Sequence, residues 1–177
     1  DAGNSSFSPV YDIDGNLRPS NNTDAVSFSS FENSTDGWGP WGGATLSLTD
    51  EAAQSGSNSL YVSGRTANWH SPRIYLDNLL TVGETYTFYV SVKLTPGSSG
   101  TADLTIRSDF ADSDSVYTSL LSNPVTVSDQ SWTLLSGDYT HASEPETFWF
   151  YVKGPSVVDG EAASFYIDDF SLVSQGS

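Results

Sequence analysis

Short runs of alternating apolar and polar residues, separated by turn-forming residues, are the feature that most restricts the fold of this chain. Such runs favour β-strands, because successive side chains of a strand point to opposite faces. Nowhere do apolar residues recur at helical spacing over several turns, so no long amphipathic helix is expected. The predicted strands are 27–32, 44–49, 59–65, 73–80, 85–94, 102–110, 124–128, 132–140, 146–154 and 164–173.

Clusters of Gly, Pro, Asn or Asp interrupt the chain between nearly all of these runs. Many short strands at this spacing predict an all-β fold, a β-sandwich (jelly roll) of two antiparallel sheets. The length of 177 residues fits one domain, alone or with a tail. We assign residues 1–26, which are turn-rich and without period, to a linker or N-terminal extension, and residues 27–177 to the sandwich module.

The charge balance restricts the possible partners. The chain has 22 acidic and 6 basic residues, for a formal net charge of −16. A field of that sign repels polyanions, so we expect no nucleic-acid partner and no binding to acidic membrane surfaces.

No apolar run is long enough to span a membrane. The chain has no cysteine, which rules out disulfides and thiolate chemistry. An acidic composition rich in Ser, Thr, Asn and Gly is typical of exported microbial proteins, and we expect a secreted monomer.

Alternation also divides the side chains of each run between the core and an outer face. In the run 85–94, Phe88 and Val90 are expected in the core, whereas Tyr89 and Lys93 point outward. We therefore expect three strands to bring aromatic and basic residues together on one outer face, which is unusual for a surface that is merely solvated. The further outward residues are Tyr61, Arg65, Trp149, Tyr151 and Lys153.

Catalysis has little support in the sequence. Most carboxylates lie in turns such as 108–115, where Asp is common because its side chain stabilises turns. His70 and His141 fall on different predicted segments, and neither belongs to a metal-ligand motif. The GxSxG motif of a nucleophile elbow is absent. A small polysaccharide hydrolase or lyase is therefore the less favoured alternative.

A structural cation is a stronger hypothesis. Glu32 follows the first predicted strand, and Asp168 and Asp169 lie on the last, so these carboxylates could meet at one edge of the sandwich. Carboxylates with turn oxygens near Ser57 would suit a hard cation, most naturally Ca²⁺. An ordinary exposed pair of strand aspartates explains the pattern equally well, and both interpretations remain open.

A neutral, hydroxyl-rich polymer is the ligand that best fits the outward residues. Sugar rings stack on Trp and Tyr through their C–H faces, and their hydroxyls pair with Arg, Asn or Lys donors. Trp69 and Trp149 could instead fill the core at strand ends, and we assign Trp132 to the core. A structural or protein-interaction sandwich, with its aromatic residues against a neighbouring domain, is the second alternative.

The segment that contains Trp69 resembles the signature of family 22 carbohydrate-binding modules, within the wider 4/9/22 group. The resemblance covers about residues 27–173, and its first element is the specific one. The matching segments are "SGRTANWHSP" (63–72), "FENSTDGW" (31–38), "SGSNSLYVSGR" (55–65), "VGETYTFYVSVK" (82–93), "DQSWTLLSGDYT" (129–140), "FYVKGP" (150–155) and "FYIDDFSL" (165–172).

The resemblance implies a β-jelly roll that binds xylan, or mixed-linkage β-1,3-1,4-glucan, and that is appended to a secreted glycoside hydrolase. It implies sugar stacking on residues similar to the family's cleft tryptophan and tyrosines, here Trp69, Tyr117 and Tyr151. This chain adds Trp149, two residues before Tyr151 on the same predicted face, as a further stacking platform. Hydrogen bonds to the sugar would come from Arg65, Asn68 and Lys153. The resemblance also implies a structural Ca²⁺, held by positions similar to Glu32 and one of Asp168 and Asp169.

Two positions depart from the family pattern. Lys153 stands where the family often has the glutamate of a Y-x-E pattern, and an ammonium donates hydrogen bonds that a carboxylate would accept. Trp41 stands where a basic residue near the cleft is expected. Mixed-linkage glucan, a β-1,3-linked glucan and an anionic polysaccharide attracted to Lys153 therefore remain open beside xylan.

Overall fold

The computed structural model describes residues 25–176, and this part of the chain contains strands but no α-helix. None of the described residues therefore forms a helix that could cross a membrane. The strands are β1 (Ala25–Ser29), β2 (Gly39–Trp41), β3 (Thr45–Thr49), β4 (Ser59–Ser63), β5 (Ser71–Tyr75), β6 (Thr85–Leu94), β7 (Gly100–Asp109), β8 (Val116–Ser119), β9 (Val125–Val127), β10 (Thr133–Thr140), β11 (Thr147–Lys153) and β12 (Phe165–Ser174).

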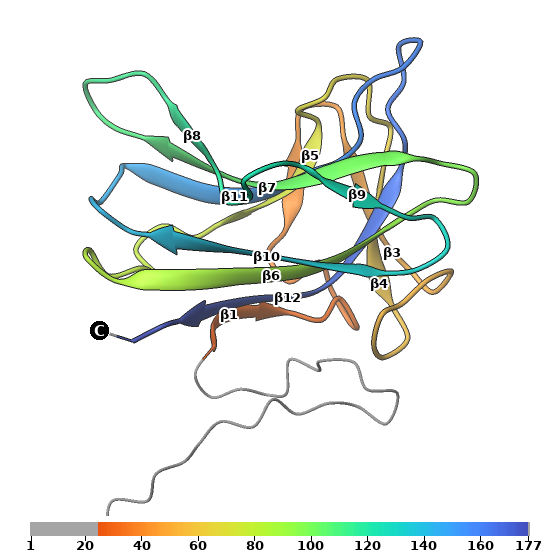
Figure 1. The fold of residues 1–177 in the computed structure, drawn as a ribbon. Helices are drawn as coiled ribbons and strands as arrows, with labels where there is room; N and C mark the ends of the chain where they lie inside the picture. The colour runs from red at the N-terminus through yellow and green to blue at the C-terminus, as the bar shows by residue number, and fades with distance from the viewer. Residues whose placement is uncertain (1–24, 177) are drawn as a thin grey trace, which may run out of the picture.

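These strands form two six-stranded antiparallel sheets that face each other as two layers (Figure 1). One sheet has the order β2-β5-β11-β7-β8, with β9 paired to β7, and is called the β11 sheet below. The other has the order β10-β6-β12-β4-β3, with β1 paired to β12, and is called the β12 sheet. The predicted all-β sandwich of two antiparallel sheets is confirmed.

The core lies between the two layers and is filled by the inward residues of both. Phe150 of the β11 sheet packs against Phe88 and Phe170 of the β12 sheet, with ring centroids 4.8 and 5.4 Å away. All three rings are fully buried. Trp132, by contrast, is not a core residue as predicted, because it is only partly buried, and its ring lies 6.5 Å from that of Tyr166.

All ten predicted strands are present, with ends that differ by a few residues. Two short strands, β2 and β8, were not predicted, and they form the two edges of the β11 sheet. The module also begins slightly earlier than expected, because β1 starts at Ala25. The remainder of the predicted extension, residues 1–24, lies outside the described residues.

The expectation that three strands share one outer face is wrong. Strands β4 and β6 belong to the β12 sheet, whereas β11 is the central strand of the β11 sheet. The outward residues Tyr61 and Tyr89 therefore lie on the opposite side of the sandwich from Tyr151. Alternation separates inward from outward side chains, but it does not say to which sheet a strand belongs.

Candidate functional site

The outer face of the β11 sheet carries a row of aromatic and basic residues. Strand pairing sets Tyr75, Trp149, Arg107 and Tyr117 side by side across β5, β11, β7 and β8. Residues paired directly across antiparallel strands point to the same face, so the four side chains form one surface. Of these, Tyr75 and Arg107 were missed by the sequence analysis. Their alternation within the runs 73–80 and 102–110 was the available signal.

Rings from the two edges of this sheet approach each other above its centre. The Trp41 ring, from β2, and the Tyr117 ring, from β8, are nearly parallel, at 13°, with centroids 6.4 Å apart. Trp41 also lies 4.8 Å from the Tyr151 ring and 5.2 Å from the Trp69 ring. These four aromatic residues line a cleft of about 410 Å³.

Two of the predicted stacking residues are covered rather than exposed. Trp149 and Tyr151 are only 6% and 5% exposed, beneath Trp41. The Trp149 ring is also flanked by guanidinium groups, those of Arg73 and Arg107, each 4.5 Å from its centroid. A sugar therefore has no free face of Trp149 on which to stack, and the prediction for Trp149 is corrected to a supporting role. Tyr151 forms the floor of the cleft.

The accessible rings of the cleft are Trp69 and Tyr117, with exposed fractions of 46% and 52%. The glycines that follow β2, Gly42 and Gly43, let the chain pack closely against the Trp69 and His70 rings. A Cβ at Gly42 would collide with the Trp69 and His70 rings, so only glycine allows the loop to approach so closely. The His70 ring meets the Trp69 ring edge-on at 4.5 Å. Trp69 is thus supported from below and open to solvent.

Arg65 does not line the cleft, which corrects the prediction that it binds the ligand. Arg65 is 2% exposed, its guanidinium donates to four backbone carbonyl oxygens, and burial lowers its pKa to about 10. It therefore stays charged at neutral pH and ties the loop that carries Trp69 to two distant segments. The acceptors are His70 O at 2.7 Å, Ala163 O at 2.8 Å, Pro155 O at 3.0 Å and Asn68 O at 3.4 Å.

The two remaining predicted polar ligands lie near the cleft. Asn68 is exposed, and its Oδ1 accepts a hydrogen bond from Val157 N at 2.7 Å, which leaves its amide donors toward solvent. Lys153 is on the outer face of β11, opposite Asp103 of β7. No described residue forms a hydrogen bond or ion pair with the Lys153 ammonium, so this group is available to a ligand.

Two hydrogen-bonding atoms below the rings of this face have no partner among the described residues. Within the described part of the chain, the Nε1 of Trp149 and the Oγ of Ser71 are buried without a partner. Ser71 is the strand partner of Trp41, whose ring also contacts Trp149. Buried polar atoms are usually paired, but both of these atoms are covered and neither residue lines the cleft, so we assign no ligand contact to them.

The carboxylates of this face are engaged in structural hydrogen bonds. Asp109 accepts from Arg107 Nε at 2.9 Å and from Thr147 Oγ1 at 2.8 Å. Burial acts to raise the pKa of Asp109, but the hydrogen bonds from Ser115, Thr147 and Arg107 outweigh it and hold the pKa below its usual value. A general acid needs the opposite shift, so Asp109 is unsuited to that role.

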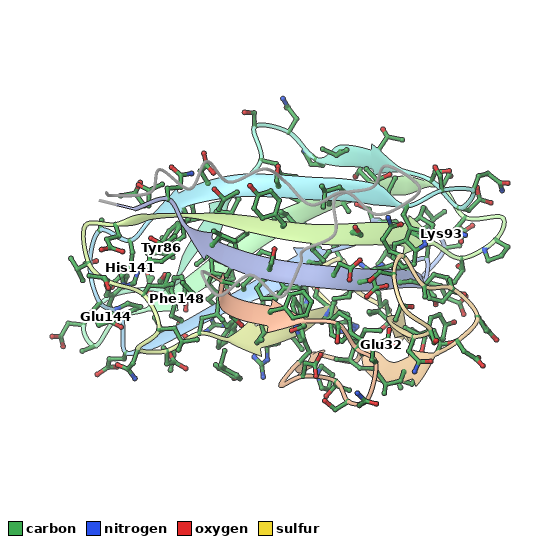
Figure 2. The ribbon with its side chains drawn as sticks, turned by 90° about the horizontal axis from the view of Figure 1, so that it is seen from below. Glu32, Tyr86, Lys93, His141, Glu144 and Phe148 are labelled. Atoms are coloured by element: carbon green, nitrogen blue, oxygen red, sulfur yellow. The ribbon has the colours of Figure 1, made fainter. Side chains whose placement is uncertain are left out.

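The two histidines are not neighbours. His70 lies beneath Trp69, whereas His141 packs against Phe148 at 5.4 Å, and its Nε2 is 3.1 Å from Glu144 Oε2. Figure 2 shows His141, Glu144 and Phe148 together at one end of the sandwich. The histidines therefore provide no shared site.

The predicted metal ligands converge on one loop, residues 54–58. Glu32 accepts from the N–H groups of Ser57 and Asn58, and Asp168 Oδ2 accepts from Gln54 N at 2.8 Å. Asp169 Oδ1 accepts from Ser55 Oγ at 2.6 Å. Among the described residues, no group of three or more acidic or histidine side chains is arranged closely enough to form a ready metal site.

The carboxylate of Asp168 is the least solvated of this set. Asp168 is fully buried, and no described basic side chain forms an ion pair with it. Burial, together with the neighbouring charge of Asp169, raises the pKa of Asp168 to about 7. A positive charge beside this carboxylate would therefore be favourable. The atoms that would coordinate such a cation are hard oxygen atoms of the kind that Ca²⁺ prefers.

Comparison with known proteins identifies relatives of the whole sandwich. Residues 23–160 match the family model CBM_4_9, described as a carbohydrate binding domain. The endo-1,4-beta-xylanase A of Thermotoga maritima is 30% identical over 153 residues, which are 84% of this chain and 14% of the enzyme. The chain thus spans about one seventh of the length of this curated relative.

Solved structures agree with this match. The CBM22-1 xylan-binding domain of Paenibacillus barcinonensis Xyn10C is 28% identical, with a TM-score of 0.78, over 87% of this chain and 96% of that domain. The C-terminal family 22 module of Clostridium thermocellum Xyn10B, whose cleft residues have a role in ligand binding, is 26% identical, with a TM-score of 0.76. That match covers 86% of this chain and 94% of the other.

Proposed function

Since the chain belongs to the CBM_4_9 family of carbohydrate binding domains, we propose that the cleft of the β11 sheet binds one chain of a β-linked polysaccharide, with xylan the first candidate. The observation that carries this proposal is the pair of exposed rings, Trp69 and Tyr117, on either side of the cleft. The predicted resemblance to family 22 modules is confirmed by the comparisons.

The division of roles follows from exposure. Trp69 and Tyr117 stack against the C–H faces of successive sugar rings, because aromatic faces attract the faintly positive C–H groups. Trp41 and Tyr151 form the apolar floor between them. The Asn68 amide and the Lys153 ammonium donate hydrogen bonds to sugar hydroxyls, and both are near the cleft without a competing acceptor among the described residues.

The module acts without catalysis, as an accessory domain of a secreted glycoside hydrolase that it keeps close to the polysaccharide. This part of the proposal is supported by relatives in which a similar segment is a small share of a xylanase. The structural hydrogen bonds of Asp109, on the same face as the cleft, also favour binding over proton transfer. Mixed-linkage β-1,3-1,4-glucan is the second candidate ligand, because it too offers extended β-linked chains.

Affinity electrophoresis tests the proposed ligand directly. The purified protein is run through native gels that contain xylan, mixed-linkage glucan, laminarin or no polymer, and reducing sugar is assayed in parallel. We expect retardation by xylan, weaker retardation by mixed-linkage glucan, and no release of reducing sugar. Unchanged mobility in every gel would reject the proposal and favour a protein-interaction role, whereas release of reducing sugar would indicate a hydrolase.

We further propose that Ca²⁺ binds at the 54–58 loop, where two carboxylates, those of Glu32 and Asp168, would hold it together with oxygen atoms near Ser57. The cation would offset the charge of the buried Asp168 carboxylate and tie β12 to this loop. Gly56 is part of the same arrangement, because a Cβ there would collide with the Glu32 carboxylate.

Thermal melting tests the calcium proposal. Protein dialysed against EDTA is compared with the same protein after addition of CaCl₂ or MgCl₂. We expect CaCl₂ to raise the melting temperature, because a ligand that binds only the folded state stabilises it, whereas MgCl₂ should have little effect. Asp168→Asn should remove the response to CaCl₂. An equal melting temperature with and without CaCl₂ would reject the site.

A further inference from the structure

We propose that Arg73 and Tyr75 form a subsite, beside the cleft, for a sugar that carries a carboxylate, such as a hexuronic acid branch on the glycan chain. The inference rests on the proposed function, because the branch must belong to a polysaccharide held by Trp69 and Tyr117. The subsite would recognise an acidic branch, whereas the aromatic rings of the cleft recognise only the faces of neutral sugar rings.

The guanidinium of Arg73 is held in place by two rings. Its central carbon lies 4.5 Å from the centroid of the Trp149 ring and 5.0 Å from that of Tyr75. Contacts of this kind fix the plane of a guanidinium without using its N–H groups. The side chain is therefore oriented before any ligand arrives, which lowers the entropic cost of binding.

The other two described arginines differ from Arg73 in what their N–H groups contact. Arg65 is buried and donates to four carbonyl oxygens, and Arg107 forms an ion pair with Asp109 at 2.9 Å. In the described part of the chain, Arg73 has neither a hydrogen bond nor an ion pair. Its donors are available in a fork that matches the two oxygens of a carboxylate.

The space around Arg73 is open on the side of the sheet edge. Its strand partner on β2 is Gly39, which has no side chain, and a Cβ built there would meet nothing within 4 Å. On β11 its partner is Tyr151, the floor of the cleft. Tyr75 is 48% exposed and offers a ring face to the sugar. Trp41 covers Tyr151, so a branch would reach Arg73 from the β2 edge, past Gly39 and the exposed Tyr75 ring.

The negative net charge of the protein limits how many carboxylates a bound polysaccharide can carry. A net charge of −16 repels a densely charged polyanion, whereas the unpaired guanidinium of Arg73 attracts a single nearby carboxylate. A hydroxyl would also accept from Arg73, but it would gain no charge-assisted hydrogen bond. The arrangement thus favours a neutral chain with sparse acidic branches over both an unbranched chain and a polyuronate.

Calorimetric titration of matched oligosaccharides tests the subsite. The probes are xylotetraose and xylotetraose with one glucuronic acid branch, each titrated into the native protein at low and moderate salt. We expect the acidic probe to bind about fivefold to tenfold more tightly at low salt, with the preference reduced at higher salt. Arg73→Gln should abolish the preference and leave the affinity for xylotetraose unchanged.

Two further variants separate the subsite from general effects of charge. Gly39→Leu keeps Arg73 but fills the space beside it, and it should reduce the preference for the acidic probe. Lys93→Gln removes a positive charge from the β12 sheet, far from the cleft, and should leave the preference intact (Figure 2 labels Lys93). Folding of each variant is checked by its melting temperature.

Equal affinity of the native protein for the two probes would overturn the subsite while leaving the proposed function in place. The same holds if Lys153→Gln, rather than Arg73→Gln, removes the preference. Failure of both probes to bind would overturn the proposed function, and the subsite with it.

Discussion

The outer faces of the two sheets arise from the same alternation of side chains, but they differ in how many of their polar groups have a hydrogen-bond partner. On the β12 sheet, three outward threonine hydroxyls bond to their neighbours: Thr87 Oγ1 donates to Asp138 at 2.7 Å, and the hydroxyls of Thr85 and Thr140 are 2.8 Å apart. On the β11 sheet, the side chains of Arg73 and Lys153 have neither a hydrogen bond nor an ion pair with any described residue. Exposed rings accompany them on that face.

This difference shows what distinguishes a binding face from a solvated one. A face whose polar groups satisfy each other has little to offer a ligand, whereas one with unpaired donors beside apolar rings gains on binding. The comparison predicts that changes on the β11 sheet alter binding and that matched changes on the β12 sheet do not.

The first prediction removes the anchor of the loop that presents Trp69. Arg65→Met should lower the free energy of unfolding by about 3 kcal/mol or more, because four carbonyl oxygens lose a charged donor in the interior. Urea denaturation measures the change. Arg73→Met is the matched control and should cost less than about 1 kcal/mol, since Arg73 contacts only ring faces. Equal losses in the two variants would contradict the anchoring role.

The second prediction removes the most prominent exposed ring of the β11 sheet. Trp69→Ala should weaken xylan binding by about 2 kcal/mol or more, roughly thirtyfold, because the stacking surface is lost. The unfolding free energy should change little, since the ring is half exposed. Isothermal titration with xylohexaose gives the affinity. Native-like affinity in a folded Trp69→Ala variant would rule out this cleft as the binding site.

The third prediction compares one tyrosine from each outer face. Tyr117→Ala should weaken binding by about 1 kcal/mol, roughly fivefold, because Trp69 and the cleft floor remain. Tyr89→Ala, on β6 of the β12 sheet, should leave the affinity within about twofold of native. The same titration applies to both variants. A greater loss from Tyr89→Ala than from Tyr117→Ala would reverse the assignment of the binding face.

The fourth and smallest effect concerns Lys153. Lys153→Gln should weaken binding to neutral xylohexaose by roughly twofold, because one donor at the rim is replaced by a shorter polar group. Lys153→Glu tests the departure from the family pattern and should restore a carboxylate acceptor for sugar hydroxyls. Competition between xylan and mixed-linkage glucan in affinity gels measures any change in preference. Identical preferences in all three proteins would exclude Lys153 from specificity.

The sequence predicted the interior of the sandwich better than its edges. Long strands such as 85–94 carry strong alternation, because every second residue is buried in the core. The edge strands β2 and β8 are only three and four residues long and lie among Gly, Pro, Ser and Asp. They carry Trp41 and Tyr117, so the strands hardest to predict are those that close the cleft.

The site residues show a similar limit. The motif around Trp69 identified the loop, but membership in a motif did not reveal that Arg65 points inward to carbonyl oxygens. Alternation placed Trp149 and Tyr151 outward correctly, yet it could not show that Trp41, from another strand, covers them. Such coverage depends on contacts between residues distant in sequence, which no local pattern contains.

A titration of ¹⁵N-labelled protein with xylohexaose, followed by amide and indole chemical shifts, tests the central claim most directly. We expect the largest shifts on the loop 64–70, on β8 and β11, and on the indole groups of Trp41 and Trp69. The amides of β6 and β10 should barely move. Shifts concentrated on β6 and β10, with the indole of Trp69 unaffected, would contradict the assignment of the β11 sheet as the binding face.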